Sequence, residues 1–332
     1  MRLKPEHPSR LVKLSLSNLP VQTVCLINTE QRPYRYATLS YCWGKIHGDT
    51  WFTTKSNLMN QLNSISVHGL PLTLQQSIEI SSKLGIEYLW IDALCIIQDD
   101  TTDWSSEASR MGAIYHGSVL TIGAASSSSS YDGCFNKNSH SAYDALGEVI
   151  QVDGTLSDGR KSSICFHRAG PNNVYLNEVL EGTLAKRAWT FQEQALSRRI
   201  LYYTNSQLIW DCQHVRLAED NSPIEDSNRL YPVLDLYGSM SYDVAVRLWY
   251  WNAVPQYSNR HLSFTSDKMV ALSALAKATY LNRRVDYIAG LWKDSLLTGL
   301  MWARDGPGNK TKTYRCPSWS WASQDSPVNY ML

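Results

Sequence analysis

The sequence lacks an excess of charge of either sign: it has 31 lysines and arginines and 30 aspartates and glutamates. Proteins that bind nucleic acid by neutralising phosphates usually carry a basic excess or a basic stripe, and the sequence has neither. Long apolar runs are missing too. The longest apolar window, 88–97, is interrupted by Asp92 and falls well short of the roughly 20 residues that a membrane span needs. We therefore expect no nucleic-acid partner and no membrane span.

Cysteine pairs and cofactor motifs are also missing. The 7 cysteines are spread along the chain without a CxxC pair, whereas a disulfide framework or a zinc site would cluster them. Residues 1–10 are polar and lack the apolar segment of a secretory signal. No GxGxxG, HExxH or GxSxG motif occurs. These absences predict a cytoplasmic protein with reduced thiols, no metal and no bound cofactor.

Tryptophan and tyrosine, in contrast, are abundant: the chain holds 12 Trp and 19 Tyr but only 5 Phe. Both residue types carry a polar atom on a large apolar body. Two interpretations stay open, a core rich in hydrogen-bonding aromatic residues and a ligand pocket lined with aromatic rings. With 43% hydrophobic and 18% charged residues over 332 positions, the chain has the composition of a folded protein with a sizeable core.

The first half of the chain alternates between strand-like and helix-like segments. The strand-like segments are 10–16, 21–27, 36–41, 87–92 and 119–124. Two helical segments, 71–85 and 103–115, separate the later strands, and Asp103 can cap the second of them. Strands joined through helices favour a sheet whose neighbouring strands run parallel.

The pattern changes toward the C-terminal part. Residues 187–196 have helical spacing and are followed by a strand hairpin over 200–211. The remaining regular segments are predicted to be helical and lie at 243–253, 266–280 and 292–302. The sequence therefore predicts an α/β domain over 1–215 and a mainly helical C-terminal extension over 216–332 that packs on it.

Three sequence blocks carry the most specific signal in the chain. They are Tyr36–Gly44 (YATLSYCWG), Leu89–Asp100 (LWIDALCIIQDD) and Arg187–Glu193 (RAWTFQE). Their order and spacing resemble the HET (heterokaryon incompatibility) domain proteins of filamentous fungi. The resemblance continues downstream and covers most of the chain, in the segments 257–260, 266–268, 289–292 and 317–323. Departures are mild: Ile97 stands where the family often has asparagine, and Ala188 where glycine is common.

The resemblance implies both a fold and an activity. The HET domain has been compared with the TIR fold, a flavodoxin-like α/β sandwich, and the family is tied to fungal non-self recognition and programmed cell death. Some TIR domains cleave NAD with a glutamate that lies four residues after a tryptophan on a helix, and Trp189 and Glu193 have that spacing here. The resemblance thus implies Glu193 as a catalytic residue and NAD as a substrate rather than a cofactor.

Glu193 and Asp92 are the candidate catalytic residues. Breaking the bond between nicotinamide and ribose develops positive charge on the sugar, which a nearby carboxylate such as Glu193 can stabilise. Alternatively, Glu193 pairs with an arginine of its own fold. Asp92 ends a predicted buried strand, at the edge where open α/β sheets place ligand crevices, or else it accepts backbone N–H groups from the following turn.

The candidate ligand-binding residues lie at the ends of predicted elements. They are Ser40, Tyr41, Trp43, Gly44, Arg187 and Trp189. Gly44 would let a ligand approach the backbone closely, and Trp43 either stacks on a ligand ring or packs in the core. Arg187 either binds a phosphate through two parallel hydrogen bonds or pairs with a carboxylate of its own fold.

Three functions stay open on the sequence. The first is a HET-type effector of incompatibility and cell death, with or without NAD cleavage. It would act with a protein partner or by self-association, because no repeat-bearing recognition segment is evident. The second is a cofactor-free cyclase or lyase of fungal secondary metabolism, which requires a deep, closed, apolar cavity for its small-molecule substrate. The third is a non-catalytic interaction module, which requires a large apolar surface patch. A polar cleft around Glu193 and Asp92 would count against the second.

Overall fold

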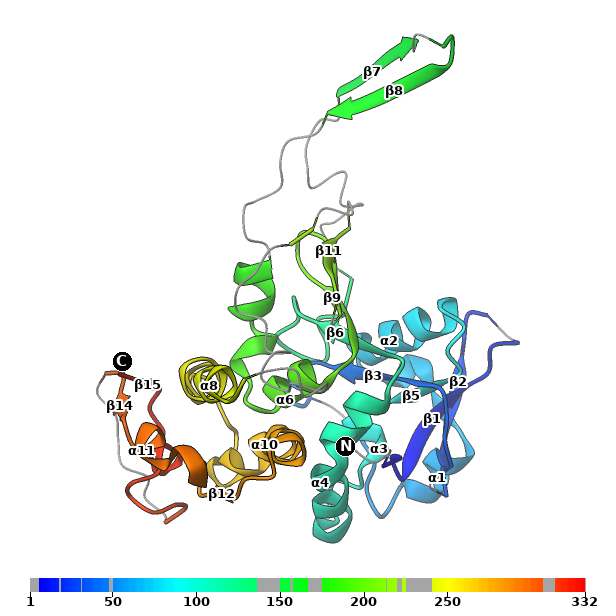
Figure 1. Cartoon of the computed structure of the whole chain (residues 1–332). Coiled ribbons are helices and arrows are strands. Elements are labelled where there is room, and N and C mark those ends of the chain that lie inside the picture. The colour runs from blue at the N-terminus through cyan, green and yellow to red at the C-terminus, as the bar shows by residue number, and fades with distance from the viewer. Residues whose placement is uncertain are drawn as a thin grey trace.

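The computed structural model describes most of the chain. The described residues are 6–17, 19–30, 32–47, 50–135, 150–155, 158–166, 175–212, 214–219, 223–224, 241–306 and 314–331. Their main element is one large sheet covered by helices, with further helices and three two-stranded sheets outside it (Figure 1). The α/β fold class predicted from the sequence is confirmed.

The large sheet has nine strands in the order β11-β10-β9-β6-β3-β5-β1-β2-β4. The strands are β1 (Arg10–Leu14), β2 (Thr23–Asn28), β3 (Tyr36–Ser40), β4 (Ile65–Ser66), β5 (Tyr88–Trp90), β6 (Leu120–Ala124), β9 (Arg199–Tyr203), β10 (Leu208–Cys212) and β11 (Arg216–Ala218). The four central strands, β5-β3-β6-β9, run parallel, and the strands outside them pair antiparallel. Numbered along the chain, the parallel strands stand in the order 2-1-3-4, which is the order of flavodoxin-like sheets.

The centre of the sheet is buried on both faces. Every residue of β3 and of β6 is buried, as is typical of parallel strands that helices cover on both sides. The polar residues within these strands find partners in the sheet or in the helices that cover it. For example, the hydroxyl groups of Thr38 and Thr121 lie 2.8 Å apart on neighbouring strands. The sequence could therefore place polar residues in the core without leaving them unpaired.

Helices cover both faces of the sheet because its crossover connections run toward opposite edges of the sheet. The helices of this part are α1 (Leu58–Asn63), α2 (Leu72–Lys83), α3 (Asp92–Cys95), α4 (Thr101–Gly117) and α6 (Trp189–Leu196), with shorter helical turns η1 (Val67–Gly69), η2 (Tyr175–Leu180) and η3 (Leu184–Lys186). The crossover from β3 to β5 runs opposite to those from β5 to β6 and from β6 to β9. Since such crossovers are right-handed, α2 covers one face, while α4 and α6 pack together on the other (Figure 1).

Helix α4 begins earlier than predicted, and its cap is a different residue. The carboxylate of Asp100, not that of Asp103, accepts hydrogen bonds from the first free N–H groups, those of Thr102 and Asp103. Asp103 instead accepts a hydrogen bond from the backbone N–H of Ile97 at 2.8 Å and pairs with Arg10. Asp103 thus connects α4 to the segment before it and to β1.

The C-terminal part is mainly helical, as predicted, but it also contains short strands. Its helices are α8 (Tyr242–Arg247), α9 (Val254–Ser258), α10 (Val270–Arg283) and α11 (Leu296–Gly299), with the turns η4 (Leu248–Ala253), η5 (Thr265–Lys268), η6 (Lys293–Ser295) and η7 (Trp321–Ser323). Its strands form two pairs, β12 (Tyr287–Ile288) with β13 (Leu291–Trp292) and β14 (Trp302–Arg304) with β15 (Val328–Tyr330). The single helix predicted over 292–302 is wrong, because both its ends pair as strands and only 296–299 are α-helical.

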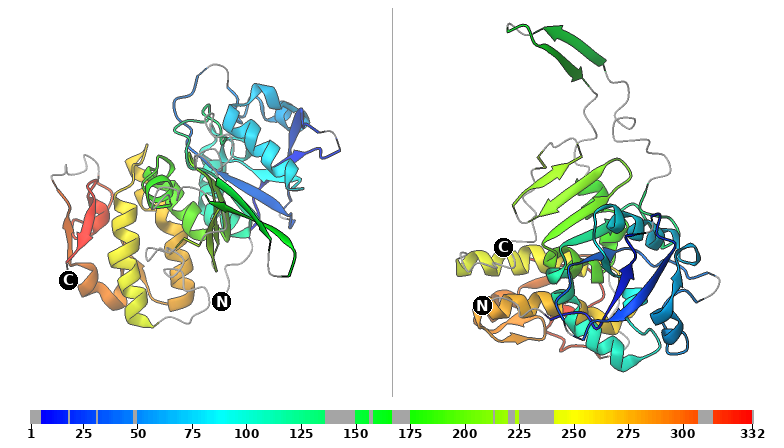
Figure 2. Two further views of the ribbon diagram at one scale, coloured as in Figure 1. Left: turned by 90° about the horizontal axis from the view of Figure 1, so that it is seen from above. Right: turned by 90° about the vertical axis from the view of Figure 1, so that its right-hand side faces the viewer.

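Helix α6 contacts both parts of the structure. One hydrophobic core lies around the large sheet, and a second joins Phe191, Ala195 and Leu196 of α6 to the C-terminal helices. Helix α10 packs on α4 and α6, as the view from above shows (Figure 2). The division at residue 215 stays a prediction, but the second core already includes a helix from the first side of that boundary.

Strands β7 (Ile150–Thr155) and β8 (Lys161–Phe166) form a hairpin of their own that projects away from the large sheet (Figure 1). Among the helices described, none has the length and apolar character that crossing a bilayer requires.

Candidate functional site

The predicted site residues meet at the carboxyl ends of the parallel strands. Ser40 is the last residue of β3, and Asp92 follows neighbouring strand β5 as the first residue of α3. Helix α6 leads back across the sheet into β9, so its first turns, with Trp189 and Glu193, lie at the same edge. This is the edge at which open α/β sheets bind ligands.

Glu193 is buried, with 7% of its surface exposed, and its carboxylate oxygen Oε2 accepts a hydrogen bond of 2.6 Å from the hydroxyl of Ser40. Burial raises the pKa of Glu193 from 4.5 to about 7, although the Ser40 hydroxyl and Arg187 act in the opposite direction. Asp92 adds to the rise. Glu193 therefore changes its charge near neutral pH, which makes it suited to chemistry in the physiological range.

Asp92 accepts hydrogen bonds from its own fold and also lines a cleft. Its Oδ1 accepts the backbone N–H of Ala93 at 2.7 Å, and its Oδ2 accepts the indole N–H of Trp43 at 2.8 Å. Burial raises the pKa of Asp92, and Arg187 counteracts the rise. Asp92 is thus held by the turn that follows β5 while one side of it borders a cleft.

Arg187 lies among these groups and already has partners within the fold. Its guanidinium Nη1 donates a hydrogen bond to the backbone carbonyl of Tyr41. Burial acts to lower the pKa of Arg187, but the nearby carboxylates of Glu193 and Asp92 raise it above its ordinary value. The buried Tyr41 hydroxyl also interacts with Asp92, and burial together with that carboxylate raises the pKa of Tyr41. Of the two predicted roles for Arg187, this environment is that of an arginine that neutralises carboxylates of its own fold.

A cleft of about 550 Å³ opens in front of these groups, within the size range of small-molecule sites. Five of the predicted site residues line it: Trp43, Asp92, Arg187, Trp189 and Glu193. Its other lining residues are Ile96, Gln98, Trp104, Met111, Ala188, His261, Leu262, Ser263, Phe264 and Asp267. Three tryptophans thus line the cleft, whereas others such as Trp90 and Trp249 are fully buried in the core.

The wall formed by residues 261–267 was not predicted from the sequence as part of the site. Backbone hydrogen bonds fasten it to the segment before α6: the N–H of His261 donates to Lys186 at 2.6 Å, and the N–H of Ala188 donates to His261 at 2.9 Å. The indole N–H of Trp189 also reaches the carboxylate of Asp267 at 3.4 Å. The one sequence signal was that 266–268 share the family resemblance.

Gly44 lies outside this cleft. Its backbone has a positive φ of 68°, and a Cβ atom there would stand 2.6 Å from the Cβ of Ser129. Gly44 therefore permits a close approach of the backbone to the serine-rich loop 126–130. Its predicted contact with a ligand stays untested.

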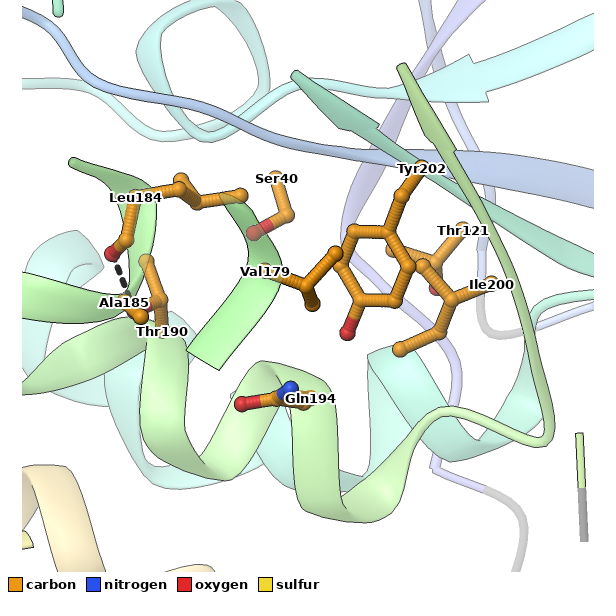
Figure 3. A pocket seen from close by; sticks show the side chains of 9 residues that line it. All are labelled: Ser40, Thr121, Val179, Leu184, Ala185, Thr190, Gln194, Ile200 and Tyr202. Carbon is orange, nitrogen blue, oxygen red and sulfur yellow. Dashed lines mark hydrogen bonds between the residues drawn. The ribbon is translucent and has the colours of Figure 1, made fainter. Parts of the chain in front are cut away.

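A separate small hollow lies beside Ser40. Figure 3 shows Ser40, Gln194 and Tyr202 around it, together with six other residues. Its volume is about 10 Å³, which is room for a single water molecule. This side of Ser40 therefore has no room for an organic molecule.

A second, apolar hollow runs along the surface between α4 and α10. Its volume is about 940 Å³, and Ala108, Val270 and Ala276 are among its lining residues. It adjoins the cleft at Trp104, which lines both. Within the described residues, no group of three or more His, Cys, Asp or Glu side chains is placed to hold a metal ion.

Fold and site together define a doubly wound α/β protein with a carboxylate-bearing, tryptophan-walled cleft at the carboxyl edge of its sheet. Residues 36–193 match the family model described as Heterokaryon incompatibility protein (HET), and this part of the chain belongs to that family. The match begins at β3, ends at Glu193, and contains all the predicted site residues. The searches of curated proteins and of solved structures found no match.

Proposed function

We propose that this HET protein hydrolyses the bond between a pyridinium base and ribose, with NAD as the reference substrate and Glu193 as the catalytic carboxylate. One observation carries the proposal: the buried carboxylate of Glu193 faces a cleft, beside Asp92 and Arg187, whose walls are tryptophan rings. Trp189 and Glu193 lie one helical turn apart on α6, and both line that cleft. This arrangement supports the role that the family resemblance implies.

The chemistry follows from how charge moves in this reaction. When the bond between ribose C1′ and the nicotinamide nitrogen breaks, its electron pair stays on the nitrogen and neutral nicotinamide leaves. The ribose becomes an oxocarbenium-like cation, which the ionised carboxylate of Glu193 stabilises at short range. A water molecule adds to C1′ and loses a proton to Glu193 or to solvent. The products are ADP-ribose, nicotinamide and a proton.

The two other functions fit the structure less closely. A cyclase for apolar substrates would need a closed apolar cavity, whereas the cleft at Glu193 contains two further acidic side chains, Asp92 and Asp267. The open groove between α4 and α10 is the observation that favours an interaction module. That role does not conflict with hydrolysis, because Trp104 is the only described residue that lines both the groove and the cleft.

The direct test is release of nicotinamide from NAD by the purified protein and by Glu193→Gln. The variant keeps the shape of the side chain and an acceptor for Ser40, but it cannot become negative. We expect it to lose at least about 100-fold in rate, the usual effect of removing a group that stabilises transition-state charge. Because the ionised form acts, the wild-type rate should rise with pH through about 7.

Glu107→Gln is the matched control. Glu107 is a buried carboxylate on α4 that pairs with Arg110 and does not line the cleft. Its replacement should leave nicotinamide release within a few-fold of wild type. No release by a folded wild-type protein at high concentration, or equal release by Glu193→Gln, would refute the proposal.

A further inference from the structure

We infer that the cleft recognises the positively charged pyridinium–ribose unit itself, and that phosphate-free pyridinium ribosides bind at least as well as the dinucleotide. The inference rests on the proposed function for turnover and extends it by naming the substrate class. It draws on the aromatic rings, the carboxylates and the cationic groups that face the cleft.

The aromatic walls are suited to a cation. The rings of Trp104 and Trp189 stand nearly perpendicular, with centroids 6.2 Å apart, and Trp43 lines the same cleft. A flat cation over an indole face is attracted by the negative charge of the ring face, and tryptophan is the strongest such partner among the aromatic residues. A pyridinium ring combines this charge with a flat shape that can stack.

Two of these tryptophans donate hydrogen bonds to carboxylates. The indole N–H of Trp43 donates to Asp92 at 2.8 Å, and the indole N–H of Trp189 donates to Asp267 at 3.4 Å. Glu193 lies on the same helix as Trp189. An approaching ligand therefore meets three carboxylates and three indoles, and acidic walls raise the local concentration of cations.

Groups that could bind phosphate are scarce in comparison. Among the described residues that line the cleft, Arg187 alone carries a guanidinium or ammonium group. Its guanidinium already donates to the carbonyl of Tyr41 and interacts electrostatically with Glu193 and Asp92, whose combined charge it offsets only in part. His261 is exposed on the wall formed by residues 261–267. A diphosphate would gain little from these groups and would be repelled by Asp267.

Binding can be measured without turnover by comparing two nearly identical probes. Tryptophan fluorescence of the protein is titrated at pH 8 with 1-methylnicotinamide, a permanent cation, and with neutral nicotinamide. We expect the cation to bind at least about fivefold more tightly, the effect of one unit charge about 4 Å away in water. Raising the salt concentration should weaken binding of the cation more than binding of the neutral probe. Equal affinity for the two probes would overturn the inference.

Two variants locate the effect. Asp267→Asn should remove most of the preference for the cation, while keeping an acceptor for Trp189. Asp286→Asn is the matched control, because Asp286 is an exposed acid that pairs with Lys293 and lines the neighbouring groove. A preference that both variants keep would place cation recognition elsewhere and refute the assignment to this cleft.

Turnover separates this inference from the proposed function. Nicotinamide riboside, nicotinamide mononucleotide and NAD are compared by kcat/KM. We expect kcat/KM to be highest for the riboside, lower for the mononucleotide and lowest for NAD. Hydrolysis with NAD preferred would refute the inference but leave the proposed function standing. Selective binding of 1-methylnicotinamide with no hydrolysis of any substrate would refute the proposed function and leave cation recognition standing.

Discussion

Replacing Glu193 by glutamine should stabilise the protein at alkaline pH, although the residue lies at the centre of the site. Burial raises the pKa of Glu193 from 4.5 to about 7, so the folded protein binds this proton more tightly than the unfolded chain does. The folding free energy contributed by this group is therefore most favourable below pH 4.5. It is lost progressively as the pH rises to about 7, and it stays lost above that.

The size of the effect follows from the same two values. Each tenfold change in proton affinity corresponds to about 1.4 kcal/mol, so the change in pKa from 4.5 to about 7 corresponds to about 3 kcal/mol above neutral pH. The side chain is 7% exposed, so solvent screening reduces this only slightly. With an unfolding entropy of about 2 cal/mol/K per residue, the expected rise in Tm is roughly 4 °C for a chain of 332 residues.

The assay is urea unfolding at pH 5 and pH 8 at one ionic strength. Glu193→Gln should be close to wild type at pH 5 and about 3 kcal/mol more stable at pH 8. Glu79→Gln is the control, because Glu79 is a half-exposed residue of α2 that pairs with Lys83. It should follow the pH dependence of wild type. If Glu193→Gln instead proved less stable at pH 8, the charged form would be favoured by folding, and the argument from burial would be wrong.

Two further predictions concern the surroundings of the site. Ser40→Ala removes the hydrogen bond that holds the pKa of Glu193 down, so the pH of half-maximal nicotinamide release should move upward; a downward or absent shift in the pH–rate profile would contradict this. Gly112→Ala should destabilise the fold by about 1–3 kcal/mol in urea unfolding, because its Cβ would lie 2.3 Å from the Cβ of Ala274 on α10. A gain of about 1 kcal/mol, the usual preference of a helix for alanine over glycine, would show that the helices can separate without strain.

Much of the site could be predicted because its residues follow elements with clear local patterns. The local patterns before Ser40 and Asp92 predicted two strands, the second of them buried, and parallel pairing of those strands brings their ends together. Helical spacing of Trp189 and Glu193 then placed both on one face of α6. These are short-range rules, and the observed geometry satisfies each of them.

The rest of the site depends on contacts that no local pattern records. The wall at 261–267 reaches the cleft through backbone hydrogen bonds with Lys186 and Ala188, some 70 residues earlier in the chain. Asp100, rather than the predicted Asp103, caps α4, because the carboxylate of Asp103 is held by Ile97 and Arg10. Both differences arise where long-range contacts outweigh local preference.

The position of α6 links the chemistry of the cleft to the C-terminal part of the chain. One side of this helix presents Glu193 toward Ser40, while Phe191 and Leu196 pack into the second hydrophobic core. The depth at which Glu193 is buried, and with it the pKa of its carboxyl group, therefore depends on how closely α10 and its neighbours press α6 onto the sheet. A HET domain without this covering layer would leave the same glutamate more exposed to water, with a pKa nearer its ordinary value. The C-terminal part thus supplies one wall of the cleft and also helps to set the protonation of the residue at its centre.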